Sequence, residues 1–191
     1  MATVSLSEPG RRANATFEDP QAMLEACHDR VQRMCTLLER LTEHAGLHGA
    51  DTQARQAATD VMRYFDLAGP HHHQDEELHI FPVLLASGDT ALIDTARTLH
   101  QQHVDMAALW QTVRAQLAAL QAGDPAPLLA DSAPATQFVT MYTAHIPLEE
   151  DVAYPAAFAR IADGQRTTIG EEMAHRRQSP TAAAPSTPPA P

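Results

Sequence analysis

The sequence has few basic residues and no long apolar run. Lysine and arginine together number 13, against 24 aspartates and glutamates, and the formal net charge is −11. An acidic chain without a basic cluster is not expected to bind nucleic acid. No apolar run approaches the roughly 18 residues of a membrane-spanning helix, and no charged and apolar leader opens the chain. The sequence therefore predicts a cytoplasmic protein that binds neither nucleic acid nor membrane, and it indicates no particular protein partner.

Cysteines are also scarce, since the chain has only Cys27 and Cys35. They lie eight positions apart in a helical pattern, which separates them by about 12 Å along a helix axis. A disulfide needs Cα atoms within roughly 7 Å of each other. We therefore expect two reduced, buried thiols rather than a disulfide framework.

Aromatic residues make up 5% of the chain, whereas hydrophobic residues reach 44%, with many alanines and leucines. No apolar pattern of period two indicates a strand. Apolar residues recur instead at spacings of three and four in four long segments, at about 19–46, 51–86, 89–122 and 134–163. Asp163-Gly164 reads as the end of the fourth helix, and Thr168 with Glu171 forms the capping-box pattern of a possible short C-terminal helix. We predict an all-α fold, an up-down-up-down four-helix bundle.

The composition changes at both ends of these segments. Residues 1–17 are small and polar with no period, which predicts a flexible N-terminal arm. From residue 179 the chain is a Pro/Ala-rich tail, which predicts disorder. The expected folded domain is therefore 18–178. The chain shows no phosphate-binding loop and no nucleophile–base pair, so the sequence leaves open whether the protein is an enzyme.

A repeat links two of the helical segments. When the chain is moved by 73 positions, "FDLAGPHHHQDEELHIFP" (65–82) lies over "FVTMYTAHIPLEEDVAYP" (138–155). The shift matches His72 with His145 and Glu76 with Glu149, and it also matches Glu77 with Glu150, Phe81 with Tyr154 and Pro82 with Pro155. A histidine at i and a glutamate at i+4 share one helix face, so an imidazole and a carboxylate can bind one ion. Two such pairs facing each other across a bundle resemble the way dinuclear metal sites are built.

The other two long segments contribute histidines to the same interpretation. A shift of 75 places Leu24 and His28 on Leu99 and His103, and each histidine lies on the apolar stripe of its segment. His100, three positions before His103, shares its face. Imidazole and carboxylate without thiolate suit iron, with manganese or zinc as lesser options. The candidate metal ligands are His28, His72, Glu76, His100, His103, His145 and Glu149.

Plainer interpretations exist for each of these residues alone. A single histidine on an apolar stripe is more often a hydrogen-bonded core residue, and a His/Glu pair at i,i+4 can be a contact on a solvated face. Taken together, however, burial of so many polar groups without an ion would cost several kcal/mol. Pro70 and Pro147, near or inside the two pairs, either shape the site or are tolerated kinks, and both alternatives stay open.

The repeat also ranks the neighbouring polar residues. It selects His72/Glu76 over His73/Glu77, so we expect His71 and His73 to point outward or to lie around the ligands, although His73 could complete a coordination sphere. His79 pairs with Val152 in the repeat, which favours a role in lining the site. Asp75 and Asp151 are expected to be surface charges.

The motifs "HHHQDEELHIFP" and "HIPLEEDVAYP", with the helices of His28 and His103, resemble the hemerythrin-like HHE cation-binding family over about residues 18–164. The resemblance implies a hemerythrin-like four-helix bundle that holds two Fe ions as an oxo- or hydroxo-bridged, non-haem di-iron centre. By motif, the resemblance implies six ligands, without His100: His28, His72, Glu76, His103, His145 and Glu149. Oxygen-carrying hemerythrins have His-x-x-x-His on the third helix and His-x-x-x-x-Asp on the fourth, whereas this chain has His100-x-x-His103 and His145-x-x-x-Glu149.

The two His-x-x-x-Glu pairs are closer to bacterial HHE proteins than to the oxygen carriers. The expected function is therefore binding or sensing of O2, or of a related small oxidant or NO, at a di-iron centre. The alternatives at the same centre are repair of iron–sulfur clusters, detoxification of peroxide or NO, and storage of iron.

Overall fold

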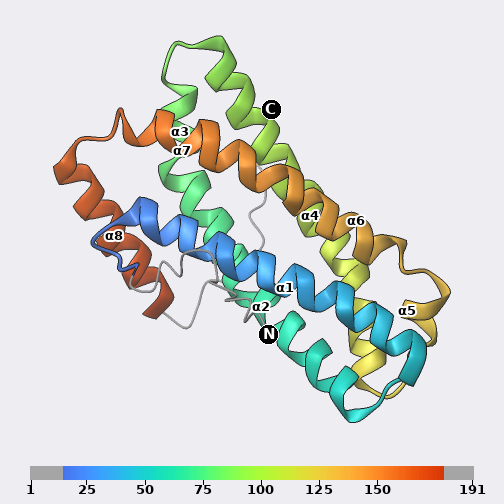
Figure 1. Cartoon of the computed structure of the whole chain (residues 1–191). Coiled ribbons are helices and arrows are strands. Elements are labelled where there is room, and N and C mark those ends of the chain that lie inside the picture. The colour runs from blue at the N-terminus through green and yellow to red at the C-terminus, as the bar shows by residue number, and fades with distance from the viewer. Residues whose placement is uncertain (1–14, 179–191) are drawn as a thin grey trace, which may run out of the picture.

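The computed structural model describes residues 15–178, and within them the regular structure is entirely helical (Figure 1). The expected flexible arm (1–17), except for its last three residues, and the Pro/Ala-rich tail lie outside these residues. The elements are α1 (Pro20–His48), α2 (Thr52–His79), α3 (Phe81–Leu85), α4 (Thr90–Gln121), α5 (Ala126–Ala130), α6 (Ala133–Leu148), the π-helix η1 (Glu149–Ala153), α7 (Tyr154–Phe158) and α8 (Asp163–Gln178).

The sequence marks the beginnings of the three longest helices with aspartates. The side chain of Asp19 accepts a hydrogen bond from the amide of Ala22 and precedes Pro20, which is the first residue of α1. Asp51 and Asp89 cap α2 and α4 in the same way. Gly49, which follows α1, has a positive φ of 66°, a backbone conformation that would be strained for a residue with a side chain. These starts agree with the predicted segments.

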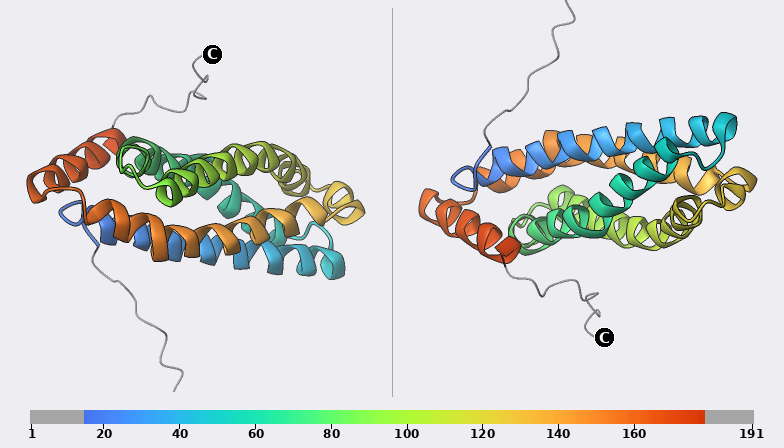
Figure 2. Two further views of the ribbon diagram at one scale, coloured as in Figure 1. Left: turned by 90° about the horizontal axis from the view of Figure 1, so that it is seen from above. Right: turned by 90° about the horizontal axis from the view of Figure 1, so that it is seen from below.

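The long helices pack as neighbours around a shared core. Helix α1 packs against α2 and α6, and α4 also packs against α2 and α6. Views from above and from below show the long helices side by side, with α5 at one end of the molecule and α8 at the other (Figure 2). The prediction of an all-helical fold is confirmed for the described residues. The finer up-down-up-down order of connections stays a prediction.

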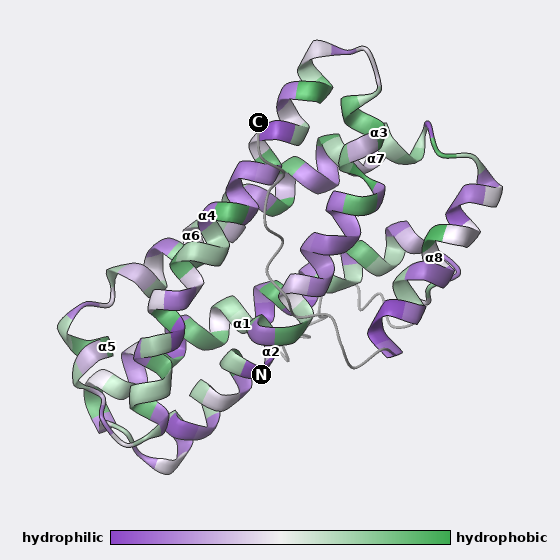
Figure 3. Ribbon diagram, turned by 180° about the vertical axis from the view of Figure 1, so that it is seen from behind, coloured by the Kyte–Doolittle hydropathy of each residue, from purple (hydrophilic) through white to green (hydrophobic). Residues whose placement is uncertain are grey.

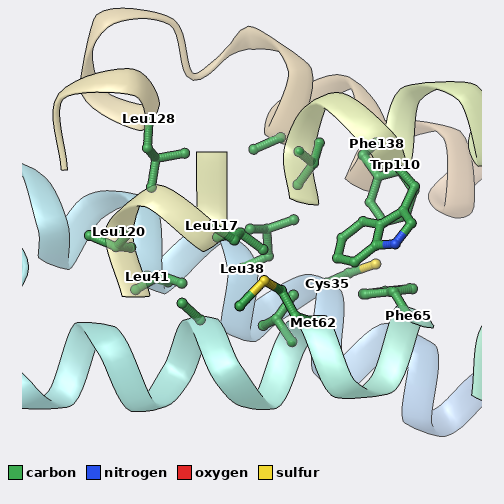
Figure 4. Close-up of a cluster of buried hydrophobic side chains, with 14 of the residues drawn as sticks. Cys35, Leu38, Leu41, Met62, Phe65, Trp110, Leu117, Leu120, Leu128 and Phe138 are labelled. Atoms are coloured by element: carbon green, nitrogen blue, oxygen red, sulfur yellow. The ribbon is translucent and has the colours of Figure 1, made fainter. Parts of the chain in front are cut away.

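Two apolar clusters fill the interior. The larger contains Phe65, Trp110 and Phe138, whose rings meet between the helices with centroids 4.9–5.3 Å apart (Figure 4). The smaller contains Leu24, Leu99 and residues of α3 and α7. Along each long helix, hydrophobic and hydrophilic residues alternate around the ribbon (Figure 3). His28 lies between Leu24 of the smaller cluster and Val31 of the larger one, so a polar layer separates two apolar ones.

Both cysteines are buried and reduced, as predicted, and contribute apolar surface to the core. No helix within residues 15–178 combines the length and apolar character needed to cross a membrane.

The end of the fourth segment differs from the prediction. The helical run ends at Phe158, and Asp163-Gly164 begins α8 instead of ending the preceding helix. Thr168 lies inside α8, where its hydroxyl donates to the carbonyl of Gly164, so the expected capping box is wrong. The helix starts at Asp163, and its apolar face, which includes Met173, packs on the smaller cluster.

Helix α8 also holds the last residue of the expected arm in place. The chain crosses α8 so closely at Gly170 that a Cβ there would lie 1.7 Å from the carbonyl oxygen of Phe17. The guanidinium of Arg177 lies 5.3 Å from the centroid of the Phe17 ring. Phe17 is therefore part of the packed structure.

Candidate metal centre

Six polar side chains meet in the layer between the two apolar clusters. His28 comes from α1, His72 and Glu76 from α2, and His103 from α4, while His145 lies in the last turn of α6 and Glu149 begins η1. Each is at most 3% exposed. Burial of six polar groups without compensation would cost several kcal/mol, so the contacts among them decide what this layer can do. The side chains that the layer brings together are His28, His72, Glu76, His103, His145 and Glu149.

Glu149 lies at the centre of the group. Its Oε2 is 3.1 Å from Nε2 of His28, and its Oε1 is 2.8 Å from Nε2 of His145 and 3.7 Å from Nε2 of His103. None of these nitrogens is aligned as a hydrogen-bond donor to it, so both buried oxygens lack a hydrogen-bond partner among the described residues. The two oxygens of Glu149 therefore face opposite halves of the centre.

Glu76 takes the corresponding position from the other side. Its Oε1 is 3.4 Å from Nε2 of His72 and 3.9 Å from Nε2 of His28, and its Oε2 is 3.5 Å from Nε2 of His103. Oε1 also accepts a hydrogen bond from the hydroxyl of Tyr154, whereas the buried Oε2 has no partner within the described chain. Both glutamates thus span the two halves.

The outer nitrogens of three histidines are fixed by neighbouring acceptors. Nδ1 of His28 lies 2.8 Å from a carboxylate oxygen of Glu150, and Nδ1 of His103 lies 2.9 Å from Glu77. Nδ1 of His145 lies 2.7 Å from Oε1 of Gln102. An acceptor oxygen at Nδ1 requires the hydrogen on that nitrogen, which leaves a lone pair on Nε2 directed into the cluster when the imidazole is neutral. The same arrangement orients metal-binding histidines in other proteins.

This tautomer makes the cluster unfavourable unless a cation is present. The Nε2 atoms of His103 and His145 are 3.2 Å apart, and with both hydrogens on Nδ1 their lone pairs face each other. The Nε2 of His145 also lies 2.8 Å from a carboxylate oxygen of Glu149. Acceptors at such distances repel one another unless a proton or a metal ion lies between them. The donor set and its orientation therefore fit metal ions.

The protonation of the metal-free centre follows from the same contacts. Burial and the Glu149 carboxylate raise the pKa of Glu76 well above its usual range. Burial acts in the same direction on Glu149, but the adjacent rings of His103, His145 and His28 outweigh it and hold the pKa of Glu149 well below its usual range. The two carboxyl groups therefore differ in opposite directions from the ordinary pKa of a glutamate, although both are buried in the same layer.

The histidines divide according to their carboxylate neighbours. Burial lowers the pKa of His28 and His103, but for both residues Glu149 and an outer glutamate outweigh burial and raise the pKa overall. Burial and the neighbouring His28 hold the pKa of His72 well below its usual range. Because of this lowered pKa, the His72 imidazole is neutral at neutral pH. The neutral imidazole is the form that binds metal.

The donor atoms form two overlapping groups that share both glutamates. In each group, the donor atoms lie within 4.8 Å of one another. The first consists of His28, His72, Glu76 and Glu149, and the second of Glu76, His103, His145 and Glu149. Two positions that share two carboxylates are the geometry of a dinuclear centre.

His73 lies beside the second group. Its ring stacks on that of His103 with centroids 3.8 Å apart, and it can approach His103 and His145 as a third donor. The expectation that His73 lies around the ligands or completes a coordination sphere is consistent with this place.

The backbone changes where it presents Glu149. Pro147 lies inside α6, and the chain continues as a π-helix from Glu149 to Ala153. A proline lacks the amide hydrogen of a regular helix turn, and a π-turn rotates the residues that follow it. Glu149 and Tyr154 both face the centre across this turn. The geometry supports a role of Pro147 in shaping the site, while Pro70 continues α2 without a change of helix type.

His100 is not brought into the cluster. Its side chain is exposed on α4, whereas His103 one turn later is buried. Successive residues differ by about 100° around a helix, so three positions leave the two side chains about 60° apart. Leu99 and His103 define the inward stripe, and that offset places His100 beyond its edge. The structure therefore does not bring His100 together with the other six candidate ligands.

Asp75 is also placed differently from the prediction, because it is fully buried. Its carboxylate lies 2.8 Å from Nη1 of Arg176 and 2.5 Å from Nη2 of Arg177, both on α8. His79, expected to line the site, instead lies 2.7 Å from Glu172 of α8. These contacts explain why "HHHQDEELH" contains so many polar residues. One face of α2 presents His72 and Glu76 to the metal centre, and another presents Asp75 and His79 to α8. Asp151 is exposed, as predicted.

Sequence reasoning missed Tyr154, Gln102 and the role of the outer glutamates. The repeat carried a signal for Glu77 and Glu150, since they occupy equivalent positions. Tyr154 was matched with Phe81 as an aromatic residue, although only the tyrosine carries an oxygen. Gln102 had no signal, because its contact with His145 depends on how α4 and α6 cross.

Fold and site together define a helical metal-binding protein with two adjoining His/Glu donor groups. The family model described as the hemerythrin HHE cation binding domain matches residues 19–157. The chain belongs to that family. It is also similar to an uncharacterized protein of Haemophilus influenzae, with 32% identity over 166 residues that cover 86% of this chain and 93% of the relative. Helix α8 lies beyond the residues matched by the family model.

Proposed function

We propose that this protein is a non-haem di-iron protein that binds or senses O2, or a related small oxidant or NO. The observation that carries the proposal is the convergence of histidine Nε2 atoms on two shared carboxylates, three of whose four oxygens have no hydrogen-bond partner among the described residues. Membership of a cation-binding family supports it. Imidazole and carboxylate donors suit iron, with manganese or zinc as lesser options.

In this proposal each donor group holds one iron ion. His28 and His72 bind the first ion, and His103 and His145 bind the second. Glu76 and Glu149, which both groups share, would contribute carboxylate oxygens to each ion. The proposal includes the up-down-up-down connection order of a hemerythrin-like bundle. When bound, iron supplies the coordination position at which a small molecule binds. His100 is not part of the proposed ligand set.

The burial of the centre favours a small ligand. Every proposed ligand is at most 3% exposed, and the apolar clusters lie directly above and below the donor layer. Such an enclosure admits a diatomic molecule more readily than an organic substrate. The alternatives of cluster repair, peroxide or NO detoxification, and iron storage would use the same ions, and a cytoplasmic location remains part of the proposal.

Metal content and an absorption spectrum test the proposal directly. Protein purified from iron-supplemented cells is expected to contain about two iron ions per chain, one for each donor group. His72→Ala removes a donor and is expected to lower this number, whereas His100→Ala, a change of the same residue type at an exposed position, is expected to keep it. Full loading of the His72→Ala variant would contradict the assignment.

The reaction of the reduced protein separates the candidate functions. A reversible spectral change on addition of O2 or NO supports binding or sensing. Continuous consumption of peroxide or NO, or transfer of iron to a damaged cluster, supports the corresponding alternative. An inert centre supports storage.

A further inference from the structure

The hydroxyl of Tyr154 lies inside the first donor group. Its oxygen is 3.2 Å from Nε2 of His28 and donates a hydrogen bond to Oε1 of Glu76. The Tyr154 side chain is completely buried, and its ring stacks on His28 with an interplanar angle of 9°. Stacking on one donor and hydrogen bonding to another fix the position of the phenol oxygen.

We propose that Tyr154 is a further metal ligand, whose phenol oxygen binds the ion held by His28 and His72. The inference rests on the proposed function, because it assigns a ligand to one of the two proposed ions. It also makes the two positions chemically different, since one has an oxygen ligand that the other lacks.

The distances among the donors fit a shared ion. Ligands bound at about 2.1 Å lie roughly 3 Å apart when they subtend a right angle at the metal. Tyr154 and His28 are separated by 3.2 Å, and His28 and Glu149 by 3.1 Å. The phenol oxygen thus occupies one more corner of the same coordination polyhedron, beside four donors from three other segments of the chain.

Comparison of the two halves of the repeat shows that the phenol oxygen is present at only one of the two donor groups. Phe81 occupies the position equivalent to Tyr154 and lies beside His103, with ring centroids 5.3 Å apart. A phenylalanine offers no oxygen, so the position formed by His103 and His145 lacks this ligand. The two halves of the repeat match at histidine and glutamate but differ at this aromatic residue.

Binding of Fe(III) by the phenol is an exchange of bonds without electron transfer. The O–H bond of Tyr154 breaks, an O–Fe bond forms, and the proton passes to solvent. A phenolate is an anionic oxygen donor, which suits Fe(III) in the way that carboxylates do. Phenolate bound to Fe(III) has a charge-transfer absorption in the visible region, which histidine and carboxylate ligands do not produce.

The full chain loaded with Fe(III) is the sample for the test. We expect a visible tyrosinate-to-iron band, and resonance Raman spectra excited in that band should show tyrosine ring modes that shift when ring-deuterated tyrosine is incorporated. Tyr154→Phe should abolish the band. Tyr142→Phe is the matched control, because Tyr142 is also buried near the centre but its hydroxyl lies 3.5 Å from His73.

The chain contains three tyrosines, which allows a test that does not depend on the folding of Tyr154→Phe. The double variant Tyr64→Phe/Tyr142→Phe leaves Tyr154 as the remaining tyrosine. Retention of the band in this variant supports the proposal, and its loss overturns it. Wild-type protein that holds two Fe(III) ions without the band also overturns it, while the proposed function stands. Failure of the wild type to bind iron overturns both.

Discussion

Glu149→Gln should have opposite effects on the stability of the metal-free and the metal-loaded protein. The substitution keeps the volume of the side chain but removes its charge and replaces one donor oxygen with an amide nitrogen, which does not bind metal. Glu149 belongs to both donor groups, so at least one group falls from four donors to three. In the metal-free protein, the new NH2 group replaces one carboxylate oxygen, so it can donate to the Nε2 of either His28 or His145, which lie 3.1 Å from Oε2 and 2.8 Å from Oε1 of Glu149, respectively.

The expected magnitudes follow from ligand linkage. A metal ion present at a hundred times its dissociation constant stabilises the fold by about 2.7 kcal/mol. Disturbing even the surroundings of a metal ligand weakens binding about 10–100-fold, and a hundredfold loss would reduce that stabilisation to about 0.4 kcal/mol. One weakened position therefore costs about 2.3 kcal/mol, or roughly 5–9 °C in Tm for a domain of this size. In the metal-free protein, one added hydrogen bond should stabilise by about 0.5–1.5 kcal/mol.

Thermal unfolding with and without a chelator measures both effects on the same samples. Iron content, determined in parallel, confirms that the loaded samples differ in occupancy. Glu171→Gln is the matched control, since Glu171 is exposed on α8 and the same chemical change there should alter stability by at most about 0.5 kcal/mol. If Glu149→Gln keeps two iron ions and the full increase in Tm on loading, Glu149 is not a shared ligand.

Two further variants test the surroundings of the centre. Asp75→Asn should lower the free energy of unfolding by about 1.5–3 kcal/mol in urea titrations, because it removes the buried charge that faces Arg176 and Arg177, while Arg176 keeps its contact with Glu172. Asp151→Asn, at an exposed position, should change it by less than about 0.5 kcal/mol, and an equally small effect of Asp75→Asn would show that the ion pair does not hold α8. Glu77→Ala removes the acceptor for Nδ1 of His103 and should weaken metal binding about tenfold in competition with a chelator. Unchanged affinity would mean that packing alone orients the His103 ring.

The predictability of the six central side chains has a simple physical basis. Five of them lie on the inward faces of α1, α2, α4 and α6, and Glu149 follows α6 directly; these faces can be found from spacings of three and four residues. The 73-residue repeat then selects His72 and Glu76 from a run that offers several alternatives. His100 shows the limit of this method, because a side chain 60° from the centre of an apolar stripe lies inside or outside depending on the neighbouring helix.

The repeat was less informative about residues whose partners lie on other helices. Glu77 and Glu150 are equivalent in the repeat, yet each orients a histidine of a third or fourth helix instead of the histidine on its own. His28 and Glu150 are separated by 122 positions in the chain. Contacts over such separations depend on helix crossing and register, which the spacing of residues along one helix does not specify.

The sequence by itself determined the all-helical fold, the beginnings of the three longest helices and the pairs of histidine and glutamate that face the interior. Helix periodicity and side-chain capping are local effects, so they can be read from the order of residues. Only the tertiary structure decided that Asp75 is buried against α8, and that Tyr154 lies at the first donor group while Phe81 lies at the second. Both outcomes depend on packing between distant segments. The π-helix Glu149–Ala153 directs Tyr154 toward the first donor group, and the packing of α8 places Arg176 against Asp75.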